Sequence, residues 1–189
     1  MFTNTMTAKE IKAEVDAEFL ALCPYFLKLN KSYSSLIKNR RIPIGFNVGI
    51  KEFVTKRNNR MIMRMRKDKK ELGISFLFKV PQDGRGFRYI IPNLTRSVLI
   101  ITNHFMDRVI EREGISVKEC IESILYNGYK VYESEMGLYS PIADGLAVLN
   151  DEGDNVYTLM TYCSRDMLKG QQIVFREDWD KWIAFLNER

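Results

Sequence analysis

The hydrophobic period of this chain changes in blocks, and these changes constrain its fold more than any other feature. Up to residue 37 apolar residues recur at the spacing of a helix, and from residue 44 they alternate with polar residues as in a strand. Helical spacing returns between residues 102 and 128 and is again followed by short alternating segments. Separate blocks of helices and strands, without a regular strand–helix alternation, are typical of an α+β protein.

The first block predicts two helices. Thr7 and Glu10 form a capping box, in which each side chain bonds the backbone of the other at the start of a helix. The apolar stripe of this helix is Ile11, Val15, Phe19 and Leu22. We expect Pro24 to mark a break or a new first turn, because proline has no N–H to donate within a helix. A second helix then covers residues 26–37 and ends before Pro43.

The next block predicts a small antiparallel sheet. Residues 61–66 alternate, with Met61, Met63 and Met65 on one face and arginines on the other. Residues 73–80 form the partner strand, 81–86 a turn and 87–91 a third strand. The first half is therefore expected to hold two helices and a basic β-hairpin region.

The second half predicts a strand, two short helices, a run of strands and a closing helix. A strand at 97–101 leads to a helix that holds His104 and ends at Gly114, a residue that suits the left-handed position after a helix. Ser116 and Glu119 form a second capping box, and their helix ends at residues 127–128. Further strands are expected at 129–132, 138–142, 146–149, 156–162 and 171–175. The closing helix at 178–186 is expected to anchor Trp179 and Trp182 in the core.

The charge of the chain divides near residue 97. The formal net charge is +5, but residues 1–97 carry 20 Lys and Arg against 8 Asp and Glu, whereas residues 98–189 carry 9 against 16. We expect a basic region over residues 1–96 and an α+β domain over 97–189, packed separately or as one unit. A basic half attracts a polyanion, or two opposite halves attract each other, and both interpretations stay open.

Composition excludes several classes of site. Cys23, Cys120 and Cys163 form no C-x-x-C pair, so we expect buried apolar side chains and no disulfide or zinc ligands. With one histidine, no acidic metal-binding loop and no cofactor motif, we expect neither a metal nor a cofactor. The sequence shows no membrane helix and no secretory signal. These features predict no membrane partner and a cytoplasmic place in a bacterial host, or association with a virion.

His104 lies on a predicted helix that carries its reactive groups on one side. Arg108 and either Glu111 or Arg112 follow it on successive turns of the same face. Imidazole titrates near neutrality and guanidinium suits a phosphate, so this face suggests phosphodiester chemistry. The structural alternative is a solvated helix face on which Arg108 pairs with Glu111 and His104 bonds the strand behind it.

A longer pattern around His104 resembles a family of small toxin domains. It reads Thr102-x-His104-x-x-x-Arg108-x-x-Glu111-Arg112-x-Gly114-Ile115-Ser116, then continues into a helix ending at 127–128 and strands near 145–148 and 156–162. It is similar to the S/T-x-H-A-x-x-R-x-x-E-R-G-I-S opening of the metal-independent ribonucleases grouped with barnase, EndoU, RelE and the ribonuclease colicins. The likeness covers residues 97–165.

The resemblance implies two helices packed on a small antiparallel sheet, with RNA held across the sheet and the helix face. It also implies that His104 is the acid/base residue, that Arg108 and Arg112 hold the phosphate, and that Thr161 is the polar group on the sheet. The ribose 2′-OH would attack the adjacent phosphorus, which leaves a 2′,3′-cyclic phosphate and a 5′-OH end without a metal. The chain has no second histidine to act as the complementary acid, and Tyr162 would fill that role only with a strongly shifted pKa.

Residues 56–70 hold eight basic residues and one acid, Asp68. The residues predicted to bind nucleic acid are Arg60, Arg64, Arg66, Lys67, Lys69 and Lys70. Alternation in the strand places Arg60, Arg64 and Arg66 on one face, where they would follow a phosphate backbone without selecting a sequence. The structural alternative is an exposed sheet edge that its charge protects from aggregation.

These observations favour a metal-independent, endoribonuclease-like protein that cleaves or binds RNA or another nucleic acid. An alternative from another class is a non-catalytic structural or accessory protein of a phage or mobile element, with the basic strand contacting nucleic acid. A third is an inhibitor that binds a protein partner through one of its charged halves. The structural expectation of the enzyme hypothesis is that His104, Arg108 and Thr161 converge in one cleft.

Overall fold

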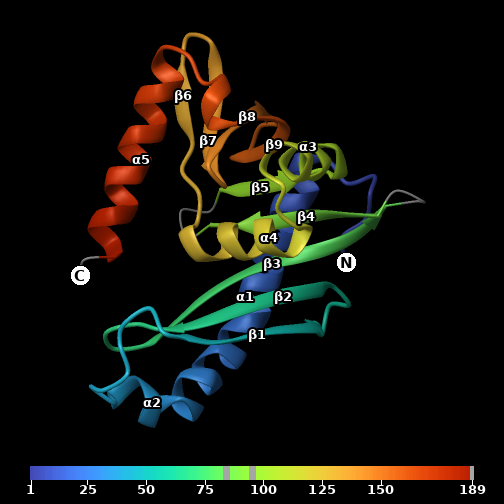
Figure 1. Ribbon diagram of the computed structural model, residues 1–189. Helices are drawn as coiled ribbons and strands as arrows, with labels where there is room; N and C mark the ends of the chain where they lie inside the picture. The colour runs from blue at the N-terminus through green and yellow to red at the C-terminus, as the bar shows by residue number, and fades with distance from the viewer. Residues whose placement is uncertain (83–85, 94–96, 188–189) are drawn as a thin grey trace.

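The computed structural model describes residues 1–82, 86–93 and 97–187, which form five α-helices, a short 3-10 helix and a sheet of nine strands (Figure 1). The helices are α1 (Ala8–Ser32), α2 (Ser34–Lys38), α3 (Asn103–Glu113), α4 (Val117–Asn127), η1 (Arg165–Met167) and α5 (Gln171–Asn187). The strands are β1 (Asn47–Val54), β2 (Arg60–Lys67), β3 (Leu72–Gln82), β4 (Gly86–Pro92), β5 (Val98–Ile101), β6 (Tyr132–Ser134), β7 (Gly137–Ile142), β8 (Gly145–Asp151) and β9 (Val156–Cys163). The α+β class expected from the sequence is confirmed.

One sheet runs through both halves of the chain, in the order β1-β2-β3-β4-β5-β9-β8-β7-β6. Neighbouring strands are antiparallel except β5 and β9, which are parallel, with Val98 opposite Val156. The antiparallel pair of β4 and β5 spans the division between residues 96 and 97. The basic and acidic halves are therefore joined by backbone hydrogen bonds in the middle of the sheet.

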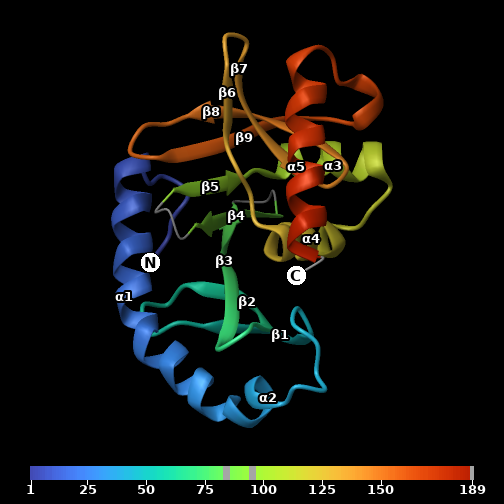
Figure 2. The same cartoon turned by 90° about the vertical axis from the view of Figure 1, so that its left-hand side faces the viewer.

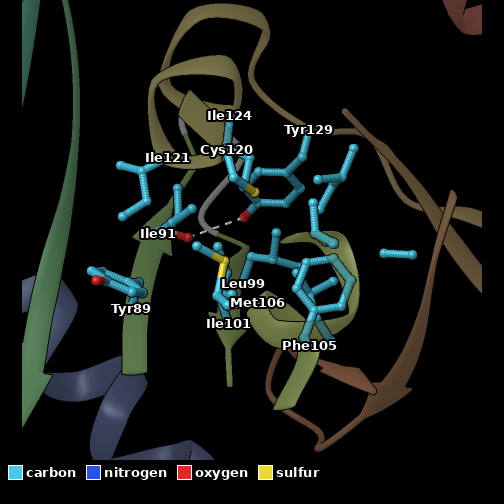
Figure 3. Packing of buried hydrophobic residues seen from close by; sticks show 14 of the residues in the cluster. Tyr89, Ile91, Leu99, Ile101, Phe105, Met106, Cys120, Ile121, Ile124 and Tyr129 are labelled. Atoms are coloured by element: carbon cyan, nitrogen blue, oxygen red, sulfur yellow. Dashed lines mark hydrogen bonds between the residues drawn. The ribbon is translucent and has the colours of Figure 1, made fainter. Parts of the chain in front are cut away.

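Helices cover both faces of this sheet (Figure 2). α1 packs on one face of the β1–β5 part, and α3 and α4 pack on the opposite face. Alternation along β5 divides its side chains between two cores: Val98 and Ile100 face α1, whereas Leu99 and Ile101 face α3 and α4. Figure 3 shows the second core, in which the hydroxyl of Tyr129 donates a hydrogen bond to the Ile91 carbonyl oxygen at 3.4 Å.

β2 lies inside the sheet, because β1 pairs with its outer side. Its predicted alternation is confirmed on one face, where Met61, Met63 and Met65 are buried in the core under α1. The alternative that the basic strand is an exposed sheet edge is wrong, since that position belongs to β1.

Pro24 does not break the first helix, which continues from Ala8 to Ser32. A proline inside a helix removes one hydrogen bond and costs about 3 kcal/mol. The apolar stripe continues on both sides of it, and Leu22 and Leu29 are both buried against the sheet. Their burial offsets the cost of Pro24, and Figure 2 shows α1 following a curved path along the sheet.

The end of the chain differs most from the sequence prediction. Residues 171–175 are the first turns of α5 and not a strand, and the segment at 129–132 reaches strand geometry only at Tyr132. The β-branched pair Ile173 and Val174 favours a strand locally. In the structure Phe175 instead stacks on Tyr132 of β6, with ring centroids 5.0 Å apart, and this packing fixes the helix.

Two predictions about burial are wrong. Cys23 is exposed on α1, while Cys120 is buried and Cys163 is partly buried. Trp179 is buried as expected, but Trp182 is 47% exposed and does not anchor α5 in the core. Among the helices of the described residues, none has the length and apolar character needed to cross a bilayer.

Candidate nucleic-acid interface

α3 is fixed to the sheet by the residues that open it. The Thr102 hydroxyl accepts a hydrogen bond from the Phe105 amide at 3.2 Å and donates one to the Leu159 carbonyl oxygen of β9 at 3.3 Å. Asn103 donates to the Gln82 side chain at 2.9 Å. Thr102 is the N-cap of α3 and also a link between helix and sheet, which places His104 in the first turn of α3.

His104 and Arg108 lie on the outer face of α3. Phe105, Met106 and Val109 are buried against the sheet, while His104 is exposed and has no hydrogen bond or ion pair to any residue that the structure describes. Arg108 donates to Glu111 at 2.8 Å, as the structural alternative expected. The predicted face exists, but one of its guanidinium groups already has a carboxylate partner.

Thr161 does not lie on the same side as His104. Its neighbour Tyr162 packs edge-to-face on Phe105 of α3, with ring centroids 6.1 Å apart. Adjacent residues of a strand point to opposite faces, so Thr161 points away from α3. Since His104 points away from the sheet on the outer face of α3, both the helix and the sheet lie between the two side chains. The structure does not bring His104, Arg108 and Thr161 into one cleft.

Tyr162 is not placed to act as the missing acid. Its side chain is fully buried, and its hydroxyl donates to Glu113 at 2.5 Å. Burial, followed by the hydrogen bond to Glu113, raises the pKa of Tyr162 well above its ordinary value. A phenol with a raised pKa gives up its proton less readily at neutral pH. The hydroxyl holds the end of α3 against β9, which is a structural role.

The six residues predicted to bind nucleic acid fall into three environments. Arg60 is exposed at the start of β2, next to the turn from β1. Arg64 and Arg66 lie beside α4, where the guanidinium of Arg64 stacks over the Tyr126 ring at 4.3 Å. Lys67 is buried, and its ammonium donates to the carbonyl oxygens of Asn39 and Ile42. The structure gives Lys67 a structural role, because its donors serve a loop of this chain.

Lys69 and Lys70 are exposed and have basic neighbours from other parts of the chain. The bonds of Lys67 hold the loop after α2 against the turn between β2 and β3, and Asn30 at the end of α1 accepts from the Leu72 amide at 2.7 Å. Three segments thus meet at the lower end of the molecule in Figure 1. We call this surface the basic end and define it as Lys31, Lys38, Arg40, Arg41, Lys69 and Lys70, all exposed.

The basic end carries six positive charges, and the acids nearest in sequence are Asp68 and Glu71. None of its six side chains forms an ion pair within 4.0 Å with a described residue. The run 38–41 is visibly basic in the sequence, but its approach to Lys69 depends on Lys67 bonding a distant loop. The hydrophobic period of the sequence does not predict such a contact between distant segments.

A second feature that sequence reasoning missed is an aromatic hollow of about 440 Å³ beside α5. Tyr129, Tyr157, Trp179 and Trp182 line it together with polar residues including Asn155 and Lys130. The two indole rings are stacked, with centroids 5.1 Å apart. Trp182 is exposed and Tyr157 partly exposed, whereas Tyr129 and Trp179 are buried, so a planar ligand such as a nucleobase would stack chiefly on Trp182.

The described part of the chain contains no group of three or more His, Cys, Asp or Glu side chains arranged to hold a metal ion. No protein-family model, curated protein or solved structure matches this chain.

Proposed function

We propose that the protein binds RNA, as an endoribonuclease-like domain of the toxin type, and that its basic end contacts the phosphate backbone. The observation that carries this proposal is the meeting of six exposed Lys and Arg side chains from three separate segments. Such a surface gains free energy from an RNA strand by releasing counterions, without reading a sequence. Charges without carboxylate partners are available for this contact.

Two further observations support RNA as the polyanion. α3 packs on β9, and α4 shares the same buried core; a helix pair on a sheet is what the resemblance to toxin ribonucleases leads us to expect. The aromatic hollow offers stacking surfaces, and single-stranded RNA is recognised through unpaired bases stacked on aromatic side chains. The sheet is larger than the small sheet of that resemblance, since it continues through β5 into β4.

The test is the affinity for labelled single-stranded RNA, measured by fluorescence anisotropy at several salt concentrations. Arg40→Glu with Arg41→Glu should weaken binding. The affinity falls with salt, and each lost phosphate contact makes the slope of log affinity against log salt less steep by about 0.7. The double variant should therefore make it less steep by about 1.4. The matched control is Lys169→Glu with Lys181→Glu, which makes the same change of net charge outside the basic end. Equal weakening by both double variants would mean that only the net charge matters, and would reject the basic end as the site.

Metal-independent RNA cleavage is the second candidate, and the free imidazole of His104 in the first turn of α3 is the observation that favours it. Neutral imidazole would take the proton of a ribose 2′-OH as that oxygen attacks phosphorus, and Arg112 on the flank of α3 would stabilise the charge that develops. The bond from phosphorus to the 5′-oxygen breaks, and the leaving 5′-oxygen takes its proton from water, which gives the 5′-OH end. Thr161 has no part in this reaction, because it lies on the other face of the sheet.

Cleavage is tested with the same RNA in EDTA. The enzyme hypothesis expects a 2′,3′-cyclic phosphate product from the wild type and none from His104→Ala, with RNA affinity unchanged. RNA that is bound and left intact by the wild type would reject cleavage and favour the alternative, a non-catalytic accessory protein of a phage or mobile element. The binding proposal does not depend on this result.

A further inference from the structure

A hollow of about 280 Å³ lies between the β1–β2 hairpin and α4. Arg64 of β2 forms one wall and Tyr126 of α4 another, and Asn47, Ser123 and Asn127 add polar groups to the lining. This hollow is separate from the basic end and from the aromatic hollow, which have no residue in common with it.

The guanidinium of Arg64 is buried without a full set of partners. The residue is 9% exposed, and its Nη1 atom is buried with no hydrogen-bond partner. No carboxylate of a described residue lies within 4.0 Å of it; the ring of Tyr126 lies 4.3 Å from the guanidinium carbon, and Glu122 attracts the charge only from beyond ion-pair distance. A buried charge without an ionic partner is unfavourable, so an anion that pairs with this guanidinium would gain free energy.

The surroundings of Arg64 strengthen its attraction for an anion. Arg66 is two residues away on the same face of β2 and donates weakly to the Tyr126 carbonyl oxygen at 3.4 Å. Asn47 is opposite Arg66 in the register of β1 and β2, which brings its amide to the same hollow. The Asn127 amide donates to the Ser123 hydroxyl at 3.5 Å, which is a long hydrogen bond. Both side chains could therefore donate to a phosphate oxygen instead.

One acidic residue, Glu122, also lines the hollow. Its carboxylate is 3.8 Å from the ammonium of Lys118 on the outer side of α4, which compensates part of its charge. Arg64 lines the opposite wall, and Arg66 lies beside the hollow on the same face of β2, so the surroundings of the hollow keep a positive balance. Glu122 weakens the binding of an anion without removing it, which makes this residue a sensitive probe of the site.

We propose that this hollow binds a phosphate group, held by the guanidinium of Arg64. A guanidinium presents paired N–H donors that match two oxygens of a phosphate, and Arg64 has one such nitrogen unused. The stack on Tyr126 fixes the plane of the guanidinium before the ligand arrives, so little side-chain freedom is lost on binding. The phosphate comes either from a small molecule or from the 5′ end of an RNA strand.

The first arm of the test uses inorganic phosphate and the intact protein. Phosphate should raise the Tm relative to chloride at equal ionic strength, by roughly 5 °C near saturation. Arg64→Met should abolish this rise, while its own Tm without phosphate should stay equal or increase, because a flexible apolar side chain replaces an unpaired charge. The control is Lys51→Met on β1, which removes one charge from the opposite face of the hairpin and should keep the rise.

The second arm compares RNA with a 5′-phosphate and RNA with a 5′-OH. A preference for the 5′-phosphate that disappears in Arg64→Met identifies an RNA end as the source, and a response to inorganic phosphate alone identifies a small molecule. Glu122→Gln should tighten the binding of either ligand several-fold, and this variant tests the site even if Arg64→Met does not fold. The proposal is overturned if the wild type responds to neither ligand. It is also overturned if Arg64→Met and Lys51→Met reduce the responses to the same extent. The outcome is independent of RNA binding by the basic end, whose variants leave the hollow intact.

Discussion

Glu14 and Glu18 bury two carboxylates of α1 against the turn between β1 and β2. Asn59 donates to both, at 2.9 and 2.6 Å, and the Thr55 hydroxyl donates to Glu18 at 2.5 Å. Arg57 adds a salt bridge to Glu14 at 2.7 Å. These bonds hold the hairpin on the helix, and buried carboxylates are stable only with such partners.

The acid stability of the protein should depend on Glu14. Burial opposes its ionisation, but hydrogen bonds from Arg57, the Met1 amino group and Asn59 outweigh burial and lower its pKa from 4.5 to about 2. A lowered pKa stabilises the folded state above the unfolded value, and this stabilisation is lost as the pH falls from 4.5 towards 2. Glu14→Gln should therefore lower the free energy of unfolding by about 1–2 kcal/mol at neutral pH, with allowance for solvent screening, and by little at the acid end. Urea unfolding across this pH range measures the effect.

The control is Asp16→Asn, which removes an exposed carboxylate of the same helix that pairs with Lys12 at 2.8 Å. An exposed pair of this kind contributes less than about 0.5 kcal/mol. A loss in Glu14→Gln that is the same at every pH would contradict the electrostatic explanation and show a packing role.

Sequence reasoning identified the residues whose roles depend on near neighbours. The caps Thr7 and Ser116 form the predicted capping boxes, and Gly114 has the expected left-handed conformation. It failed for Arg64, which it expected to be accessible, because the burial of that side chain depends on α4. The alternation of a strand shows on which face a charged side chain lies, but it does not show which helix packs over that face.

At the scale of elements, α5 is a helix whose position depends on a small number of contacts. Arg176 donates to the carbonyl oxygens of Ala143 and Gly145 in the turn between β7 and β8, at 2.8 and 3.1 Å, and pairs with Asp180 at 2.6 Å. Phe175 stacks on Tyr132. Much of the remaining surface of α5 is exposed, including Ile173, Val174 and Trp182. Arg176 is therefore one of the main contacts that fix α5, together with Phe175 and the buried Trp179.

Arg176→Met should loosen α5 without unfolding the sheet. The change leaves two turn carbonyls without their donor, which costs about 1–3 kcal/mol for each buried unsatisfied group. Hydrogen exchange of residues 171–185 should become much faster, while the exchange of β8 and β9 stays slow. Lys181→Met, an exposed change on the same helix, is the control. Faster exchange throughout the sheet would show that α5 is part of the cooperative core.

The elements that the sequence predicted well are those with a clear period, such as β2, α3 and α4. The first turns of α5 were mistaken for a strand, because Ile173 and Val174 have strand propensity and the contact that decides the outcome, Phe175 with Tyr132, is distant in sequence. The break expected at Pro24 does not occur for a similar reason. Leu22 and Leu29 both pack on the sheet, and their burial outweighs the cost of a proline inside the helix.

At the scale of the whole molecule, the decisive feature is the central position of β5. The sequence predicted this strand, but not its partners: Val98 pairs with Pro92 on one side and with Val156 on the other. A parallel pair between strands so distant in the chain leaves no local pattern. The class of the fold and most elements were predictable, whereas the single sheet, the basic end and the hollow at Arg64 depend on long-range pairing.

The two halves should therefore not fold alone. Cutting between residues 96 and 97 separates β4 from β5 and exposes apolar residues of both cores, such as Ile90 under α1 and Leu99 under α3 and α4, each 0% exposed in the intact chain. Fragments 1–96 and 97–189, prepared separately, should show little native structure by circular dichroism and two-dimensional NMR. Mixed at low salt they should recover it, because a net charge of +12 meets one of −7 and the missing strand neighbours become available. The intact chain should unfold in a single transition. A separate fragment 97–189 with native chemical shifts, or two transitions in the intact chain, would contradict this and show that the second half is a domain whose pairing with β4 adds little stability.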